Sequence, residues 1–415
     1  MTTTPRLRLP AFVSVAVLAF VAISADGYDL AIFGAAIPDL LADPDWGLTP
    51  ARIGVIAGTA IAGMCLGSIA AGVLADRFGP RRLFLACVTW FSVGMILCAA
   101  APSAELLGIA RFAAGLGLGG LGPAAIALTM SVAPHHRRNF LNGVMLTGLP
   151  VGGVVAALSA LAFLEGGGWR AVFLIGGVIP LLTVVPIGAA KLRTWAPDSG
   201  VATPHRQNVG VSLRTLLGDG GARALAGFVV VTGCCQVLSY GLLTWLPQIM
   251  KSAGYSLGSS LVFLIVFSLG AMGGSAIGSW AADRIGGRRI TIAGFAIGAV
   301  AIFGLSMPLP QPILYLSLFL AGAGTVGIQP VVYGFAALHF PANVRGSALG
   351  FIGGIGRIGG VCGPILGGVL AGLPALVNFS VFAGIAVFAS LLGLVVLTSR
   401  HPEPAPANTT VPAGA

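Results

Sequence analysis

The chain has 415 residues, of which 56% are hydrophobic and only 8% are charged, and its mean hydropathy is +0.98. No water-soluble core needs so much apolar surface, so the composition excludes a soluble globular protein and indicates an all-α protein that crosses a membrane many times. The net charge of +10 would suit a nucleic-acid partner, but the positions of the basic residues, described below, argue against that interpretation.

Apolar segments of about 20 residues or more, separated by short polar turns, predict twelve membrane-spanning helices. They fall near residues 11–39, 51–75, 83–101, 104–133, 139–164, 170–190, 223–249, 258–282, 289–308, 311–338, 344–371 and 376–398. All six cysteines lie within these spans and lack the spacing of zinc ligands, so we interpret them as small packing residues.

The first span carries two carboxylic acids. Asp26 and Asp29 are three residues apart and share a helix face, and a helix that starts near Ala11 places Asp26 roughly 20 Å into the membrane. An ionised carboxylate costs several kcal/mol at this depth, and it is tolerated where it lines a cavity, pairs with a cation or takes up a proton. Gly27 permits close approach to the backbone, and Tyr28 adds an aromatic ring with a hydroxyl group. We expect the two acids to bind and release a proton; a polar pair buried against other helices is the simpler alternative.

A loop motif occurs twice. The sequence Asp-Arg-x-Gly-x-Arg-Arg follows the second span at residues 76–82 and recurs 207 residues later at 283–289. A basic loop would explain the arginines but not the matched acid and glycine, so the repeat predicts two six-helix halves. The acid can face a helix N-terminus of the other half, while the arginines bind the ends of neighbouring helices in one conformation only. We therefore expect a gate made of these residues: Asp76, Arg77, Arg81, Asp283, Arg284 and Arg288.

The basic residues lie mainly on one side of the membrane. Of the 22 Lys and Arg residues, 17 fall at the termini or in the loops after every second span, and only Arg52, Arg170 and Lys251 fall on the opposite side. This positive-inside pattern predicts cytoplasmic termini and contact with anionic lipid, with no nucleic-acid partner. We expect an N-terminal six-helix bundle at 1–190, a cytoplasmic linker at 191–222, and a C-terminal six-helix bundle with a short tail at 223–415.

Arg111 precedes a glycine-rich run in the fourth span. Two roles are open for its side chain: a structural one, in which it snorkels to the outer surface, and a proton-coupling one beside Asp26 or Asp29. The glycines that follow it, between residues 115 and 122, favour close packing of this span against the first.

The second half carries polar and aromatic residues at membrane depth. The seventh span has no acid, but its Gln236 and Tyr240 can hydrogen-bond a ligand or, equally, another helix. The tenth span carries Tyr333 and Phe335 in a helix loosened by a proline. Arg357, midway through the eleventh span, needs an anion, and its planar guanidinium fits a carboxylate with two bonds. A permanent pair with one of the acids of the first span is the structural alternative.

The two loop motifs resemble those of the major facilitator superfamily, and the resemblance covers nearly the whole chain. Within it, the Asp-Gly-Tyr-Asp at 26–29 and the Gly-Arg-Ile-Gly-Gly at 356–360 look like motifs of the aromatic acid:proton symporter family. The resemblance implies import of benzoate-type acids, such as hydroxybenzoates and protocatechuate, into bacteria by means of the proton gradient. The chain departs from the family in the fourth span, where Met130-Ser131-Val132 replaces an acid-aromatic pair and Ala124 stands where Asn is frequent. These departures affect the expected substrate more than the mechanism.

We therefore expect a monomeric transporter of the bacterial inner membrane, not an enzyme and without a cofactor, that works by alternating access of its two halves. A proton on the acids and a substrate carboxylate on Arg357 would neutralise the buried charges, so that the site can close. The expected proton-coupling residues are Asp26, Asp29 and Arg111, and the expected substrate-binding residues are Arg357, Tyr28, Gln236, Tyr240, Tyr333 and Phe335.

Three alternatives remain open at this point: transport of another organic anion or metabolite, proton-driven drug efflux, and a non-transporting receptor or channel, which the gate loops in both halves disfavour. Efflux proteins of the superfamily carry a Gly-Pro-x-x-Gly-Gly signature in the fifth span. In this chain the good match lies in the eleventh span at residues 363–368, and the fifth span has it out of register at 148–153. That placement disfavours export.

Overall fold

The structure is a computed structural model that describes residues 11–132, 141, 144–193, 221–341 and 344–395. Most of the predicted linker and both termini therefore lie outside the described residues. The regular elements of the described part are all helices: α1 (Ala11–Ala42), α2 (Pro50–Ala99), α3 (Ala104–Val132), α5 (Gly148–Arg193), α7 (Gly221–Ser252), α8 (Leu257–Ile285), α9 (Gly287–Gly304), α10 (Gln311–Gly324), α11 (Gln329–His339), α12 (Arg345–Leu370) and α13 (Ala375–Val395).

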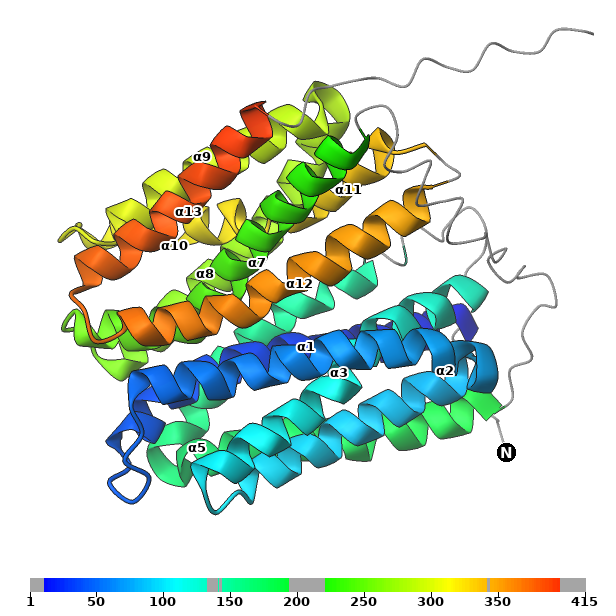
Figure 1. The fold of residues 1–415 in the computed structure, drawn as a ribbon. Helices are drawn as coiled ribbons and strands as arrows, with labels where there is room; N and C mark the ends of the chain where they lie inside the picture. The colour runs from blue at the N-terminus through cyan, green and yellow to red at the C-terminus, as the bar shows by residue number, and fades with distance from the viewer. Residues whose placement is uncertain (1–10, 133–140, 142–143, 194–220, 342–343, 396–415) are drawn as a thin grey trace, which may run out of the picture.

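Twelve helical segments in the described part of the chain are long and apolar enough to cross a membrane. They coincide with the twelve predicted spans to within a few residues; the largest shift is in the third, which begins at Arg77 and not near residue 83. The prediction of an all-α protein with twelve spans is confirmed. Figure 1 shows the helices in two groups, with α1, α2, α3 and α5 in one and α7 to α13 in the other.

Both copies of the loop motif turn at their glycine. In the first copy Gly79 interrupts α2 with a φ of +76°, so this element holds two spans. In the second copy Gly286 separates α8 from α9 with a φ of +95°. A residue with a side chain pays roughly 1–3 kcal/mol for such a conformation, so the shared glycine of the motif has a backbone cause.

Within the N-terminal group the helices pack backbone to backbone at small residues. A Cβ added to Gly152 of α5 would lie 2.0 Å from the carbonyl oxygen of Ser24 in α1. A Cβ added to Gly115 of α3 would lie 2.0 Å from the carbonyl oxygen of Ala60 in α2, so this glycine packs against the second span and not, as predicted, against the first. These distances leave no room for a larger residue, which explains the glycine content of the spans.

The two groups meet along α2 and α12. A Cβ on Gly54 would come within 2.6 Å of the carbonyl oxygen of Pro364, and one on Gly360 within 3.1 Å of the Ile61 side chain. The contact continues as far as Arg357, whose Nη1 donates to the carbonyl oxygen of Met64 at 3.4 Å. This stretch of α2 begins on the side of the membrane where the loop at 43–49 lies.

Beyond Arg357 the same two helix faces no longer touch. Gly350 lies seven residues before Arg357, and Gly72 lies eleven residues after Ile61, so both lie on the faces that make the contact. A Cβ at Gly350 or Gly72 would have nothing within 4 Å. Arg357 therefore lies where the two groups part, and open space follows from there toward the loop at 76–82.

The tenth predicted span is interrupted between α10 and α11. Over this break the N–H of Gly327 donates to the carbonyl oxygen of Gly322 at 3.0 Å, five residues back and not four. The thiol of Cys235 in α7 donates to the carbonyl oxygen of Thr325 at 3.3 Å. Irregular backbone at membrane depth is tolerated where it is buried in protein or lines an open space, and such breaks are frequent at binding sites.

Candidate functional site

The acid at position 29 is held inside the N-terminal group. Asp29 of α1 forms an ion pair with Arg111 of α3, and the side chains are 0% and 2% exposed. The Arg111 guanidinium also lies over the rings of Phe33 and Phe173, at 4.7 and 5.9 Å from their centroids. Arg111 therefore does not snorkel outward; it compensates the charge of Asp29.

The acid at position 26 has a different environment. The Oδ1 atom of Asp26 is buried without a hydrogen-bond partner in the described part of the structure. The charges of Asp29 and of Arg357, which lies on α12 in the other group, both act on it. Asp26 thus lies within electrostatic reach of Arg357 in the second half, and it has no ion pair among the described residues.

Arg357 has no carboxylate partner among the described residues, where the ion pairs are Arg52–Glu105 and Arg111–Asp29. The permanent pair with Asp26 or Asp29, one of the sequence alternatives, is therefore not formed in this conformation. Within the described part of the structure, the guanidinium makes a long hydrogen bond to the backbone of α2. A half-buried guanidinium with unused donors is suited to bind a carboxylate with two parallel bonds.

Two tyrosines border Arg357 along α12. A Cβ on Gly360 would lie 3.3 Å from the ring of Tyr240, and a Cβ on Gly353 would lie 3.4 Å from the hydroxyl of Tyr333. Because these glycines are three residues after and four before Arg357, the two rings lie one helical turn to either side of it on the same face. Both tyrosines were predicted from the sequence as substrate-binding residues. The two glycines that leave space for their rings were not predicted, although their positions one turn before and one turn after Arg357 could have indicated them.

An amide pair joins α7 to α11. The Nε2 of Gln329 donates to the Oε1 of Gln236 at 2.7 Å. Gln236 is 3% exposed, and Gln329 is half-buried at the start of α11, just after the break in the tenth span. Gln329 is not among the predicted site residues, although the sequence shows it as an amide beside a proline at membrane depth.

Two predicted site residues lie elsewhere. The hydroxyl of Tyr28 donates to the carbonyl oxygen of Val172 at 2.8 Å, and its ring packs against Gly176 of α5, so Tyr28 belongs to the interior of the N-terminal group. Phe335 packs edge-on against Phe228 at 5.0 Å, and a Cβ on Gly287 would lie 2.8 Å from it. These contacts place Phe335 at the end of the C-terminal group near the second loop motif. The structure therefore does not bring either ring to Arg357.

The predicted gate residues occupy the ends of helices. Arg284 lies over the ring of Trp280 at 4.0 Å, and Arg77 lies over that of Phe78 at 5.5 Å. Arg288 donates to the carbonyl oxygens of Gly393 and Leu394 at the end of α13, at 3.4 and 2.5 Å, which suits a cation at a helix C-terminus.

The remaining members of the two loop copies are Asp283, which is exposed, and Arg81, which is half-buried. The side chain of Asp76 lies outside the described residues. In the described part of the chain, no group of three or more His, Cys, Asp or Glu side chains is placed to hold a metal ion.

The chain is similar in sequence and in fold to known membrane transporters. A family model described as Major Facilitator Superfamily matches residues 19–313 and 262–414. The chain is 38% identical over 380 residues to the gentisate transporter of Corynebacterium glutamicum, covering 90% of this chain and 84% of that protein. It is 29% identical over 425 residues to the benzoate transport protein of Acinetobacter baylyi, covering 94% and 91%. Among solved structures, the D-xylose-proton symporter has the same fold, with a TM-score of 0.77, 19% identity and coverage of 92% and 97%.

Proposed function

The chain belongs to the Major Facilitator Superfamily of transporters and is related to bacterial transporters of aromatic acids, and on this premise we propose that it imports gentisate or a similar hydroxybenzoate together with a proton. The observation that carries the proposal is the position of Asp26 and Arg357. The two residues belong to different halves and lack ion-pair partners in the described structure, and the last contact of α12 with α2 is the hydrogen bond of Arg357 to Met64.

These two residues divide the chemistry. Arg357 receives the carboxylate of the substrate, because its free donors match the two oxygens of that group. Asp26 takes up the proton, since an unpaired carboxylate is costly at membrane depth and protonation removes the charge. Once both charges are neutralised, the halves can close over the substrate without burying an ion, so proton and acid cross together.

The ring of the substrate would lie along α12. Tyr240 and Tyr333 border Arg357 on either side and offer aromatic faces for stacking. The amide pair of Gln236 and Gln329 offers donors and acceptors at a second place, suited to a ring hydroxyl. This arrangement favours a hydroxylated benzoate over an unsubstituted one, in keeping with the relative that transports gentisate.

The two halves act as the moving domains of this mechanism. The space beyond Arg357 opens toward the loop at 76–82, and by the positive-inside pattern this is the cytoplasmic side of a bacterial inner membrane, where both termini also lie. The loops at 76–82 and 283–289 then serve as gates on that side. Arg288 already holds the end of α13, so the second loop is tied to its own half in this conformation.

Uptake of labelled gentisate into vesicles tests the proposal. With an imposed pH gradient, acidic outside, we expect accumulation above the external concentration, and we expect a protonophore to abolish it. Accumulation that persists in the protonophore would overturn proton coupling. A gradient-dependent export of the same acid, with no import, would favour the efflux alternative. The test uses the full chain reconstituted in a defined orientation.

A further inference from the structure

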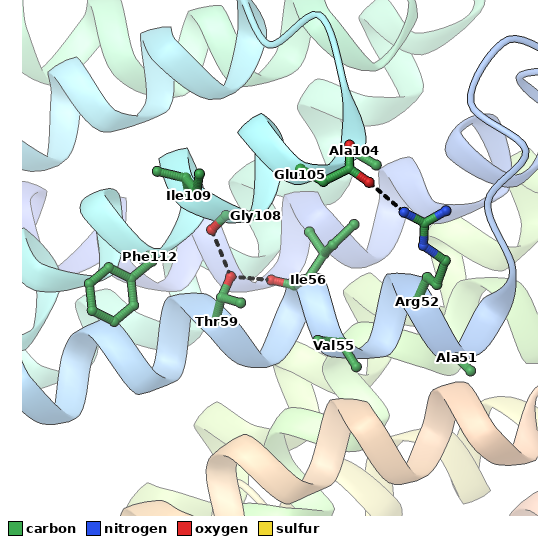
Figure 2. A pocket seen from close by; sticks show the side chains of 10 residues that line it. All are labelled: Ala51, Arg52, Val55, Ile56, Thr59, Ala104, Glu105, Gly108, Ile109 and Phe112. Carbon is green, nitrogen blue, oxygen red and sulfur yellow. Dashed lines mark hydrogen bonds and ion pairs between the residues drawn. The ribbon is translucent and has the colours of Figure 1, made fainter.

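A groove of about 610 Å³ lies between α2 and α3, outside the site described above. Figure 2 shows Arg52 and Glu105 joined at one end of this groove, with Val55, Thr59, Gly108 and Ile109 along its walls. Since α2 and α3 both begin here, the charged end lies at the membrane surface opposite the loop at 76–82. The groove runs from there into the membrane.

The groove faces the lipid and not the second half of the protein. Gly54 and Gly58 of α2 point toward α12, because a Cβ on either would contact that helix. Val55 and Thr59 each follow one of these glycines and therefore project about 100° away. Val55 is 52% exposed. In a membrane-spanning helix, such a surface is covered by hydrocarbon chains.

The side chains within the groove offer no free hydrogen-bond donor to a ligand. Thr59 is the polar side chain within the groove. Its hydroxyl donates to the carbonyl oxygens of Ile56 at 2.7 Å and Gly108 at 3.0 Å. Ile109 on the opposite wall is apolar and 63% exposed. Such walls match an acyl chain.

The charged end has the opposite character. Arg52 and Glu105 are joined by a contact of 2.5 Å, and their side chains remain 53% and 67% exposed. An ion pair so exposed contributes little to stability by itself. However, it presents a cation and an anion side by side at the level of the lipid headgroups. Arg52 keeps guanidinium donors that the pair does not use, and Glu105 keeps its second oxygen.

We propose that this groove binds a phospholipid with a phosphoethanolamine headgroup. The acyl chain lies between Val55 and Ile109, the phosphate accepts from Arg52, and the ammonium donates to Glu105. Phosphocholine has the same charges but no N–H group to donate, and phosphoglycerol has no cation for the glutamate. The ion pair therefore selects for ethanolamine among common headgroups.

Two variants separate the groove from its charged end. A Cβ on Gly108 would meet only the Cγ1 of Ile56 at 3.8 Å, so the Cβ of Gly108→Leu is accommodated, and we expect the rest of the side chain to extend into the groove that Gly108 lines. Gly384→Leu is the matched control, because Gly384 is an exposed glycine of α13 with nothing within 4 Å of a Cβ. The double variant Arg52→Gln and Glu105→Gln removes both charges without leaving either residue unpaired.

The measurement is thermal unfolding of the delipidated full-length protein in detergent, titrated with phosphatidylethanolamine, phosphatidylcholine or phosphatidylglycerol of identical acyl chains. We expect half-maximal stabilisation at a concentration about tenfold lower for phosphatidylethanolamine than for the other two. Gly108→Leu should lose this response and Gly384→Leu should keep it, while the charge-free double variant should respond equally to all three lipids. Glycerophosphoethanolamine, which has the headgroup without acyl chains, should not compete at the same concentration.

Equal responses of the wild-type protein to the three lipids would overturn the proposal and leave only general solvation by lipid. An unchanged preference for phosphatidylethanolamine in Gly108→Leu would place the lipid elsewhere and would also overturn it. The two leucine variants are compared before any lipid is added, so that a loss of folding in Gly108→Leu is recognised. In that event the double glutamine variant tests the proposal. If this variant still prefers phosphatidylethanolamine although both charges are gone, the headgroup does not bind at Arg52 and Glu105.

Discussion

Replacement of Asp29 by Asn should destabilise the protein, whereas the same change at Asp26 should not. Asp29→Asn keeps the shape of the side chain but removes the negative charge that compensates the buried Arg111. Removal of one partner from a buried ion pair costs about 3–5 kcal/mol, because the other charge stays buried without compensation. Asp26 has no ion-pair partner among the described residues, so Asp26→Asn leaves no such charge behind.

A double variant provides the control. In Asp29→Asn with Arg111→Gln both charges are removed together, so no uncompensated ion is left in the buried site. Since replacement of a whole buried pair by neutral residues is often close to neutral, we expect the double variant to recover most of the stability that Asp29→Asn loses. Recovery would show that the loss came from the uncompensated Arg111.

The assay combines unfolding and transport. Unfolding of the purified variants in detergent reports stability, and uptake of labelled gentisate into vesicles reports coupling. Asp26→Asn should unfold like the wild type, bind substrate and fail to accumulate it against a gradient. An Asp29→Asn protein as stable as the wild type would refute the assignment of Asp29 and Arg111 as a structural pair. An Asp26→Asn protein that still accumulates substrate would show that Asp26 is not the coupling acid.

Three further outcomes are expected. Arg357→Lys should lose most gentisate binding, measured by isothermal titration, because an ammonium cannot make the planar two-bond contact; wild-type affinity would assign Arg357 to packing. Gln329→Leu should weaken gentisate binding by about 1–3 kcal/mol and leave benzoate binding unchanged, and equal losses for both acids would exclude contact with a ring hydroxyl. Gly152→Ala should lower the unfolding temperature, because its methyl group would lie 2.0 Å from a carbonyl oxygen of α1, whereas Gly122→Ala, with nothing within 4 Å, should not.

The spans, the turns and the shared helix face of the two acids can be predicted from the sequence because each depends on residues close together in the chain. Apolar runs locate the twelve spans because length and hydrophobicity decide whether a helix crosses a membrane. The repeated motif locates the turns at Gly79 and Gly286 because the positive φ there requires glycine. The spacing of Asp26 and Asp29 likewise places both acids on one side of α1.

What sequence does not predict is the neighbour that each side chain meets. Residues three apart are rotated by about 60°, so two acids on one side of a helix can still face different helices. Asp29 pairs with Arg111, whereas Asp26 has no such partner among the described residues and lies within electrostatic reach of Arg357. Tyr28 and Phe335 illustrate the same limit, since an aromatic ring in a span gains as much from packing on a helix as from packing on a ligand.

The pairing of Asp29 with Arg111 has an electrical consequence for the proposed cycle. With those two charges compensating each other in the N-terminal half, Asp26 and Arg357 remain to take up one proton and one monocarboxylate anion. A complete cycle then moves no net charge, so the membrane potential, worth about 2.3 kcal/mol per charge for each 100 mV, does no work on the substrate. The pH difference alone sets the limit, and one pH unit supports about tenfold accumulation. Such a protein feeds a cell from a mildly acidic medium and stops, or runs backward, in an alkaline one.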